Sequence, residues 1–229
     1  MVKYLGSRQK IIRRLGILPG LTRKVTRKLL KTPGEHGKVR FAQAQRPSLS
    51  GDYRERLVEK QKLRYNYGIT ENQLISYYKK AKKGKESTGS LLLKFLESRL
   101  DCIVYRLGFA PTIPSARQLV NHRHILVNDT IVNIPSFLCK KGDLISVKKK
   151  DHIKKLVSSY LSVLEKKRKL VETRIRLFKV SRKQNIKYLL PGHLEVNSQS
   201  LTGKVAKIIK RANHILKIKD LKVVEYYSR

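Results

Sequence analysis

Residues 115–136 read SARQLVNHRHILVNDTIVNIPS, and this stretch decides the fold. A Ser-x-x-Gln capping box at its start opens a short helix over residues 116–121. Over residues 124–134, apolar side chains recur at alternate positions on either side of a turn at Asn128-Asp129. Alternation with a period of two is typical of strands, so the stretch predicts a helix followed directly by a β-hairpin.

The regions on either side of this stretch predict further helices and short strands. Apolar residues lie at helical spacing both before and after it, and turn signals separate the segments. The expected helices cover residues 52–64, 70–84, 91–107 and 154–180, and the expected strands cover residues 137–139, 144–147, 193–196 and 221–224. The predicted fold class is therefore α+β, with two helices packed on a small, strongly bent sheet.

Residues 1–51 form a basic N-terminal extension. They hold thirteen Lys or Arg and a single acid, Glu35, among many Gly and Pro. Such a segment buries too little apolar area to offset the entropy of ordering, so we expect it to order on a phosphate backbone. A solvated tail is the alternative.

The charge of the whole chain indicates the class of partner. Its 229 residues carry 53 Lys plus Arg against 16 Asp plus Glu, a formal net charge of +37. Such an excess of positive charge repels itself, and a polyanionic partner that neutralises it is the best explanation. Nucleic acid is the leading candidate for that partner. Hydrophobic residues make up 40% of the chain, enough for a core. No uncharged apolar run of about 18 residues could span a membrane, and the lack of Trp argues against a peripheral membrane binder.

The residues that most often carry chemistry form no catalytic or metal-binding set. Cys102 and Cys139 lack zinc-ligand spacing and are expected to be small, buried apolar side chains. Asp101 is expected to pair with a nearby arginine rather than to act as a general base. For His122 and His124, hydrogen bonding or RNA contact is favoured over metal ligation. The sequence therefore predicts no enzyme, no metal, no cofactor and no small-molecule substrate.

Cationic and amide side chains around the helix–hairpin junction form the candidate binding set. The predicted helices and hairpin can bring them to one side, where they would meet phosphates and ribose hydroxyls. RNA is favoured over duplex DNA because no dimer or long recognition helix is evident. The set consists of Arg99, Arg106, Arg117, Gln118, His122, Arg123 and His124.

Several motifs closely resemble the family of small-subunit ribosomal protein four, the S4 family. Those in its RNA-binding module are RLD at 99–101, SARQLV at 115–120, NHRHILVN at 121–128 and VNIPS at 132–136. Further matches in the family's order are YLG at 4–6, PGEHGK at 33–38, EKQKLR at 59–64, YG at 67–68, TG at 88–89 and VEYYSR at 224–229. Only residues 150–190 find no counterpart.

The resemblance implies a structural component of the small ribosomal subunit. Such a protein would bind 16S-type rRNA directly in its 5′ domain, nucleate subunit assembly, and line the path by which mRNA enters, beside small-subunit ribosomal protein five. Lys38, Arg40 and Arg46 match the family's mRNA-facing loop, and the module residues match its rRNA-facing surface. Further rRNA contacts are expected from Lys10, Arg13, Arg14, Lys60, Lys62 and Arg64. The alternative is an RNA-modifying enzyme or assembly factor that carries the same module, but no catalytic domain is attached.

The resemblance also implies a domain order. Residues 52–97, completed by residues 191–229, would form a helical domain into which the module, residues 98–149, is inserted. Residues 150–190 would form a basic helical insertion that is exposed at the surface. Its helix could reach extra rRNA, a neighbouring protein or only solvent.

Details of the sequence resemble the plastid branch of the family. They are KIIRRLG at 10–16, LPGLT at 18–22 and NHRHIL at 121–126. A chloroplast ribosome is therefore expected, with bacterial cytoplasm as the alternative. Because the family pattern starts at Tyr4, synthesis inside the organelle is expected as well.

Two departures from the family pattern bear on these expectations. The hairpin turn is Asn128-Asp129 where the family usually has Asn-Gly. A type I′ turn needs positive φ at both positions, so Asp129 should cost about 1 kcal/mol or force another turn. Some relatives hold zinc through N-terminal cysteines, but no cysteine precedes Cys102 here.

Overall fold

The computed structural model describes residues 6–23, 34, 51–148, 150–178, 191–207, 216 and 218–228. These residues belong to two compact units. The first comprises residues 1–93 and 216–229, and the second comprises residues 94–215. Each unit has its own buried hydrophobic cluster, so each is described by itself.

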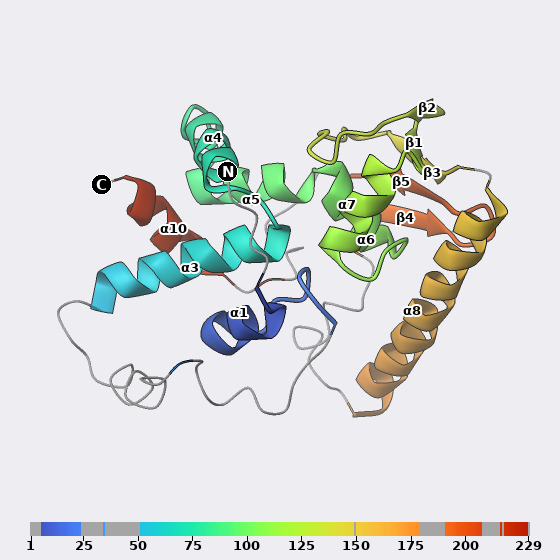
Figure 1. The fold of residues 1–229 in the computed structure, drawn as a ribbon, viewed down its shortest axis with the longest axis horizontal. Coiled ribbons are helices and arrows are strands. Elements are labelled where there is room, and N and C mark those ends of the chain that lie inside the picture. Colours follow the sequence, from blue (N-terminus) through green and yellow to red (C-terminus); the bar gives the residue numbers. More distant parts are fainter. Residues whose placement is uncertain are drawn as a thin grey trace. The chain divides into compact units, whose positions relative to one another are not determined.

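The first unit is helical. It contains α1 (Arg8–Leu15), α3 (Gly51–Tyr67), α4 (Glu71–Lys82), the start of α5 (Thr88–Glu97) and α10 (Asp220–Tyr227) (Figure 1). A capping box opens α4, because Thr70 and Gln73 each accept a hydrogen bond from the other's backbone N–H. α10 packs against α3, so the C-terminal residues close this unit.

α1 lies within the basic extension, where the sequence predicted no helix. Ile11 and Leu15 are buried in a cluster with Leu18, Leu21 and Leu216, and α3 supplies further apolar contacts. The extension has few apolar residues, but residues 8–15 place them on one face of a helix. A partner helix, rather than RNA alone, therefore orders this part.

The strand predicted at residues 221–224 is wrong, because residues 220–227 form α10. Val223 is fully buried, and the Tyr227 hydroxyl, one helical turn later, donates a hydrogen bond to Glu71 Oε1 at 2.7 Å. Four residues are too few to separate a strand pattern from a helix pattern, and docking on α3 decides the outcome.

The second unit is built on a five-stranded antiparallel sheet. Its strand order is β2-β1-β3-β5-β4, with β1 (Ile125–Val127), β2 (Thr130–Ile131), β3 (Leu144–Val147), β4 (Leu194–Asn197) and β5 (Thr202–Val205). α6 (Leu100–Leu107) and α7 (Ile113–Asn121) share a core with the sheet (Figure 1). The helix and hairpin predicted from residues 115–136 are confirmed as α7, β1 and β2, but the capping box predicted at Ser115 is wrong. α7 begins at Ile113, and the Thr112 hydroxyl caps it by accepting from the N–H of Ser115 at 3.3 Å.

The single helix predicted over residues 91–107 is wrong, because α5 ends at Glu97 and α6 begins at Leu100. Arg99 between them is extended, with φ −66° and ψ 142°, and bridges to Leu138. The N–H of Leu100 donates to the carbonyl of Phe137 at 2.8 Å. Periodicity could not predict this break, because the apolar spacing is continuous through it and the contacts that cause it come from a segment nearly forty residues away.

The sheet also corrects the expected domain order and one strand. Residues 191–229 were expected to complete the helical domain, but β5 pairs with β3, so residues 194–205 belong to the sheet of the second unit. Their alternating apolar residues need a sheet to bury against. The strand expected at 137–139 is wrong as well, since it makes only the isolated bridge between Leu138 and Arg99.

The hairpin turn forms with Asn128 and Asp129 at positive φ, 48° and 61°. Both residues thus have the positive φ of a type I′ turn, so Asp129 has not forced another type of turn. Asn128 also links the turn to β3: its Oδ1 accepts from the N–H of Leu144 at 2.9 Å, and its Nδ2 donates to Asp143 at 3.1 Å. These bonds help to hold the strained turn.

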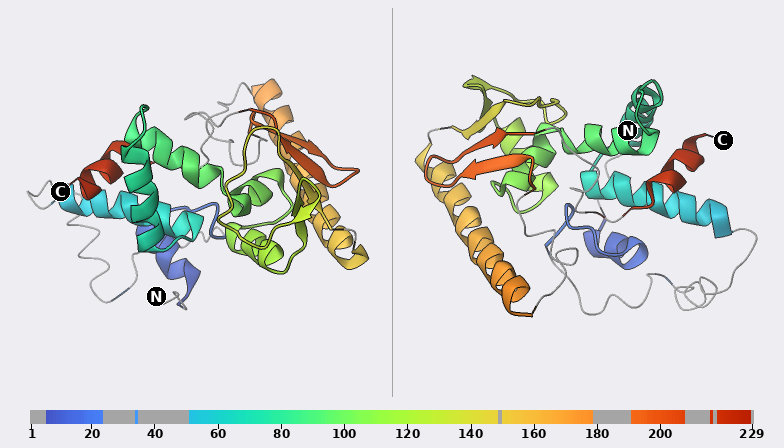
Figure 2. Two further views of the ribbon diagram at one scale, coloured as in Figure 1. Left: turned by 90° about the horizontal axis from the view of Figure 1, so that it is seen from above. Right: turned by 180° about the vertical axis from the view of Figure 1, so that it is seen from behind.

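α8 (Asp151–Phe178) is the long basic helix predicted over residues 154–180. Exposure was expected, but Ile153, Val157 and Leu161 are buried in the core of the second unit. Figure 2 shows the rest of α8 continuing past the sheet. Among the described helices, none is both long enough and apolar enough to cross a membrane.

Candidate nucleic-acid interface

The end of α7 presents the predicted polar set at the surface. Gln118, His122 and Arg123 are exposed and His124 is half-buried. The chain leaves α7 through a tight turn, in which Arg123 has φ 59° and the N–H of His124 donates to Leu119 at 3.1 Å. This turn places the three consecutive side chains at the junction of α7 and β1.

The end of β3 and the start of α8 add further cations to this junction. The N–H of Lys148 donates to the carbonyl of His124 at 2.9 Å, which fixes the end of β3 beside the turn. The rings of His122 and His124 lie 6.0 Å apart. Burial, followed by the charges of Lys150, His122, Lys148 and His152, lowers the pKa of His124 below its ordinary 6.5.

We call this region the α7–hairpin surface, and it combines groups from α7, the α7–β1 turn, the end of β3 and the start of α8. Burial is the largest cause of the lowered pKa of His124, and the nearby Lys148 and Lys150 are the cations that would attract phosphate. The surface consists of Arg117, Gln118, His122, Arg123, His124, Lys148, Lys150 and His152.

Asp101 holds Arg117 at the edge of this surface. Its carboxylate accepts from Arg99 at 3.0 and 2.9 Å and from Arg117 Nη2 at 2.7 Å. Asp101 is 1% exposed, whereas the side chain of Arg117 is 31% exposed. The predicted ion pairing of Asp101 is confirmed, and it orients a guanidinium that still reaches solvent.

Arg99 and Arg106 were predicted to contact RNA, but the structure buries both. Arg99 is 2% exposed beside Asp101, and Arg106 is 5% exposed beside Glu97, where its Nε lies 2.8 Å from Oε2. Neither guanidinium is available to a phosphate, so these residues stabilise the module. The sequence did hold a signal for this burial. Glu97 and Asp101 lie within an apolar stripe, and a buried acid requires a cationic partner.

Lys60 was also predicted to contact rRNA and is also buried. It is 5% exposed, with Nζ 3.0 Å from Glu71 and 4.6 Å from the Tyr226 ring centroid. These contacts tie α3 to α4 and α10. The burial of Lys60 could not be predicted locally, because its partners Glu71 and Tyr226 lie far from it in the sequence.

The remaining predicted cations differ in how far they reach solvent. Lys62 pairs with Glu59 at 2.6 Å and is 24% exposed. Arg64 is half-buried, with its guanidinium 5.4 Å from the Tyr65 ring centroid. In α1, Lys10 and Arg14 are exposed and Arg13 is half-buried. The predicted mRNA-facing residues Lys38, Arg40 and Arg46 lie outside the described residues.

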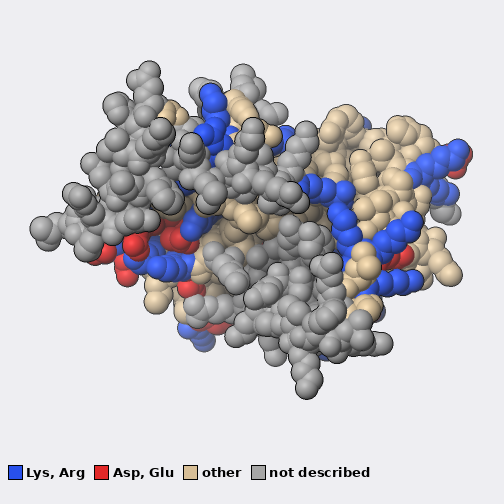
Figure 3. Space-filling view, turned by 90° about the horizontal axis from the view of Figure 1, so that it is seen from below, with Lys and Arg blue, Asp and Glu red and all other residues tan. Residues whose placement is uncertain are grey.

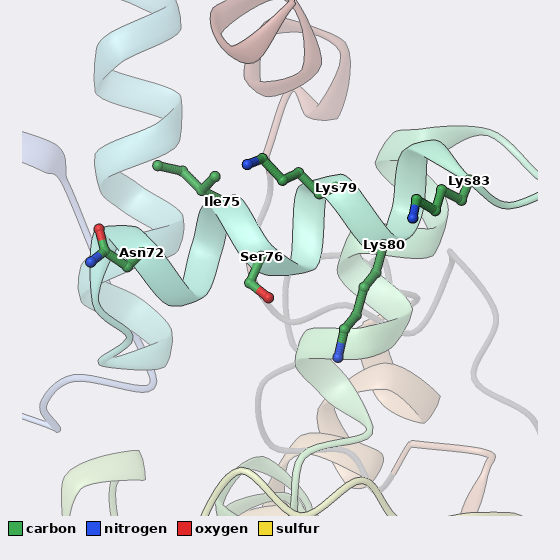
Figure 4. A pocket seen from close by; sticks show the side chains of 6 residues that line it. All are labelled: Asn72, Ile75, Ser76, Lys79, Lys80 and Lys83. Carbon is green, nitrogen blue, oxygen red and sulfur yellow. The ribbon is translucent and has the colours of Figure 1, made fainter.

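A second basic region on α4 was missed by the sequence reasoning. A hollow of about 410 Å³ is lined by Asn72, Ile75, Ser76, Lys79, Lys80 and Lys83, whose side chains are spread along the helix (Figure 4). The lysines at residues 79, 80, 82 and 83 could have indicated this basic region from the sequence. Lysines at the end of a helix are, however, also typical of an ordinary solvent-exposed helix end.

Ion pairs offset part of the positive charge of the first unit. On the face drawn in Figure 3, basic side chains are visible over the described surface, with acidic side chains clustered among them in one region. Glu55, for example, pairs with Lys222, and Arg56 pairs with Glu225 at 2.7 Å.

The thiols lie inside the second unit. Burial raises the pKa of Cys139 to about 12 and also raises the pKa of Cys102, which donates to Glu97 at 3.2 Å. Within the described part of the chain, no three His, Cys, Asp or Glu side chains gather as metal ligands. Both cysteines therefore act as small buried side chains, as expected.

A two-helix module on a bent sheet with a cationic helix–hairpin edge, joined to a helical domain, defines an RNA-binding protein class. The family description "S4 domain" matches residues 98–145, and "Ribosomal protein S4/S9 N-terminal domain" matches residues 3–97. The chain belongs to the ribosomal protein S4 family of the small ribosomal subunit.

Relatives match along their whole length. The small ribosomal subunit protein uS4c of Cyanophora paradoxa is 48% identical over 229 residues, which cover 100% of both chains. The uS4c of Rhodomonas salina is 49% identical, and uS4 of Crocosphaera subtropica is 47% identical, each over 100% of this chain and 99% of the relative. The chain is thus a structural ribosomal protein rather than an enzyme, and its similarity to uS4c proteins supports the expected plastid ribosome.

Proposed function

We propose that this protein binds 16S-type rRNA directly through the α7–hairpin surface. The observation that carries the proposal is the contrast among the module's cations. Arg99 and Arg106 are buried and form ion pairs with buried acids. Gln118, His122 and Arg123, in contrast, are exposed at the junction of α7 and β1. Phosphate contacts from such groups position a protein on folded RNA, and amides and imidazoles add hydrogen bonds to sugars and bases.

Two finer roles belong to the same proposal. Early rRNA binding would nucleate assembly of the small subunit, because an exposed cationic surface on a folded module can bind before other proteins arrive. Lys38, Arg40 and Arg46 would face mRNA where it enters, beside small-subunit ribosomal protein five. These roles are supported by the resemblance of the PGEHGK motif and by family membership.

The α4 hollow is a second candidate rRNA contact. Two of its three lysines and its two polar side chains come from α4, and the third, Lys83, is the residue that follows this helix. The capping box and the buried Leu74 and Tyr77 hold α4 in place. A rigid helix that presents lysines toward a hollow suits a phosphate backbone.

The experiment is a comparison of two RNAs. The affinity for a small-subunit rRNA 5′-domain transcript is measured beside an unrelated structured RNA of equal length, over a salt series. Both should bind at low salt, because phosphate neutralisation is independent of sequence. The proposal expects the rRNA to keep a large advantage at physiological salt. A parallel loss of affinity for both RNAs would contradict it.

A further inference from the structure

α8 consists of two halves that differ in packing. In the first half, Ile153, Val157 and Leu161 are buried, and Leu161 and Leu164 lie over Gly108, where a Cβ would come within 2.5 Å of Leu164. This half ends at Glu165, whose carboxylate accepts a hydrogen bond from the hydroxyl of Ser198 in the β4–β5 turn. The first half is therefore anchored to the core.

The second half, residues 166–178, extends beyond that anchor. Among its described side chains, none is buried, and Leu170 is 64% exposed. Thirteen residues at 1.5 Å each give a length of about 20 Å. Figure 2 shows this part of α8 continuing past the sheet.

The two halves also differ in charge. Residues 151–165 contain two lysines and two acids, so they are neutral overall with His uncharged. Residues 166–178 contain six Lys or Arg and a single acid, Glu172, which leaves a net charge of +5. The charge of the helix is thus concentrated in the half whose described side chains are not buried.

Internal requirements of the helix do not explain this concentration. Cations stabilise a helix dipole only within the last turn, but Lys166 to Lys169 lie more than two turns before Phe178. Like charges three residues apart, such as Lys166 and Lys169, destabilise a helix. Solubility does not require them either, because the rest of the chain carries 37 − 5 = +32. A partner that neutralises the charge would remove the cost.

We propose that residues 166–178 form an RNA-binding arm, which contacts phosphates that the α7–hairpin surface does not reach. Successive residues of a helix are rotated by about 100°, so the four cations at 166–169 surround the axis. That arrangement suits phosphates on more than one side better than a flat protein partner. Lysine is also depleted in protein–protein interfaces.

The arm contacts a separate part of the RNA. Lys166 lies fourteen residues after His152, so about 21 Å of helix separates the arm from the α7–hairpin surface. The inference rests on the proposed rRNA binding and names a second contact region for the same RNA.

The first test removes two charges from the arm. Lys166→Gln combined with Lys169→Gln keeps helix propensity and is compared with Lys140→Gln combined with Lys141→Gln, two exposed lysines of the same unit. At about 0.15 M salt each phosphate contact is worth roughly four- to fivefold in affinity, so the arm variant should bind the 5′-domain transcript about 20-fold more weakly. Its salt slope should fall by about 1.5, with the control close to wild type.

The second test locates the arm on the RNA. Cys102 and Cys139 are buried, so a Leu170→Cys variant can be labelled selectively with an iron chelate that cleaves nearby RNA backbone. If the arm binds RNA, we expect strong cleavage at a few discrete nucleotides in the complex. Uniform weak cleavage, as with free chelate, would overturn it.

The outcomes separate this inference from the proposed function. If wild-type protein shows no preference for the rRNA, both fail. If wild-type protein prefers the rRNA but the arm variant binds as tightly as the control, only the arm is overturned. A weaker arm variant with discrete cleavage supports both.

Discussion

The buried carboxylate of Asp101 provides the sharpest test of how the module is stabilised. Replacing Asp101 with Asn keeps the size of the side chain and removes its charge. Arg99, 2% exposed, would then lose the carboxylate charge of Asp101, and so would the more exposed Arg117. A buried ion pair broken on one side leaves an uncompensated charge, which is the most costly case.

The magnitude follows from the contacts. Asp101 accepts two hydrogen bonds from Arg99 and two from Arg117, the latter from Nη2 at 2.7 Å and Nε at 3.2 Å. Charge-assisted bonds contribute about 1.5–3 kcal/mol each, and the Asn oxygen can still accept one of them. The expected loss is that of removing one partner from a buried ion pair, about 3–5 kcal/mol, a large share of the ~5–15 kcal/mol that holds a typical domain.

The assay is urea unfolding followed by circular dichroism, because urea leaves ionic strength unchanged. Asp129→Asn serves as the matched control, since it removes the same charge from an exposed turn position that Asn tolerates. The control should stay within about 0.5 kcal/mol of wild type. A loss for Asp101→Asn of less than 1 kcal/mol, or one equal to that of the control, would refute the reasoning.

Three further predictions concern the turn, the thiols and pH. Asp129→Gly should stabilise the protein by about 0.5–1 kcal/mol in urea, because it removes the positive-φ strain of a non-glycine residue; a lower unfolding midpoint would contradict this. Cys102 and Cys139 should resist iodoacetamide in the folded protein and react fully once it is unfolded, because burial raises both pKa values; stoichiometric alkylation of folded protein would count against it. His124 has a lowered pKa and is mostly neutral near pH 7, whereas a bound phosphate favours its charged form. The affinity for rRNA should therefore rise as pH falls from about 8 to 6 at fixed ionic strength, and His124→Gln should reduce that rise. The free protein should lose stability below 6.5, where only the unfolded histidine takes up a proton readily.

The local parts of the fold were predictable from the sequence. α4 follows from the capping box at Thr70, and α7 with the hairpin follows from the switch between helical and alternating periodicity in residues 115–136. Asp101 was correctly predicted as an ion-pair partner. In each case the determining contacts lie within a few residues or follow from a single chemical rule.

The errors arose where distant segments decide the structure. The break at Arg99 depends on Leu138, and the helical state of residues 220–227 depends on docking against α3. The burial of Lys60 depends on Glu71 and Tyr226, which the sequence does not mark as neighbours. A sequence shows which side chains carry charge, but the fold decides which charges remain exposed.

The central claim is that the exposed α7–hairpin surface, and not the buried cations, binds rRNA. The most direct measurement is the affinity of Arg123→Gln for the 5′-domain transcript across a salt series, together with its urea unfolding curve. Arg123 is exposed at the turn, so stability should be unchanged while the affinity falls about fivefold at ~0.15 M salt and the slope falls by about 1. Unchanged affinity and slope with an unchanged unfolding curve would contradict the account.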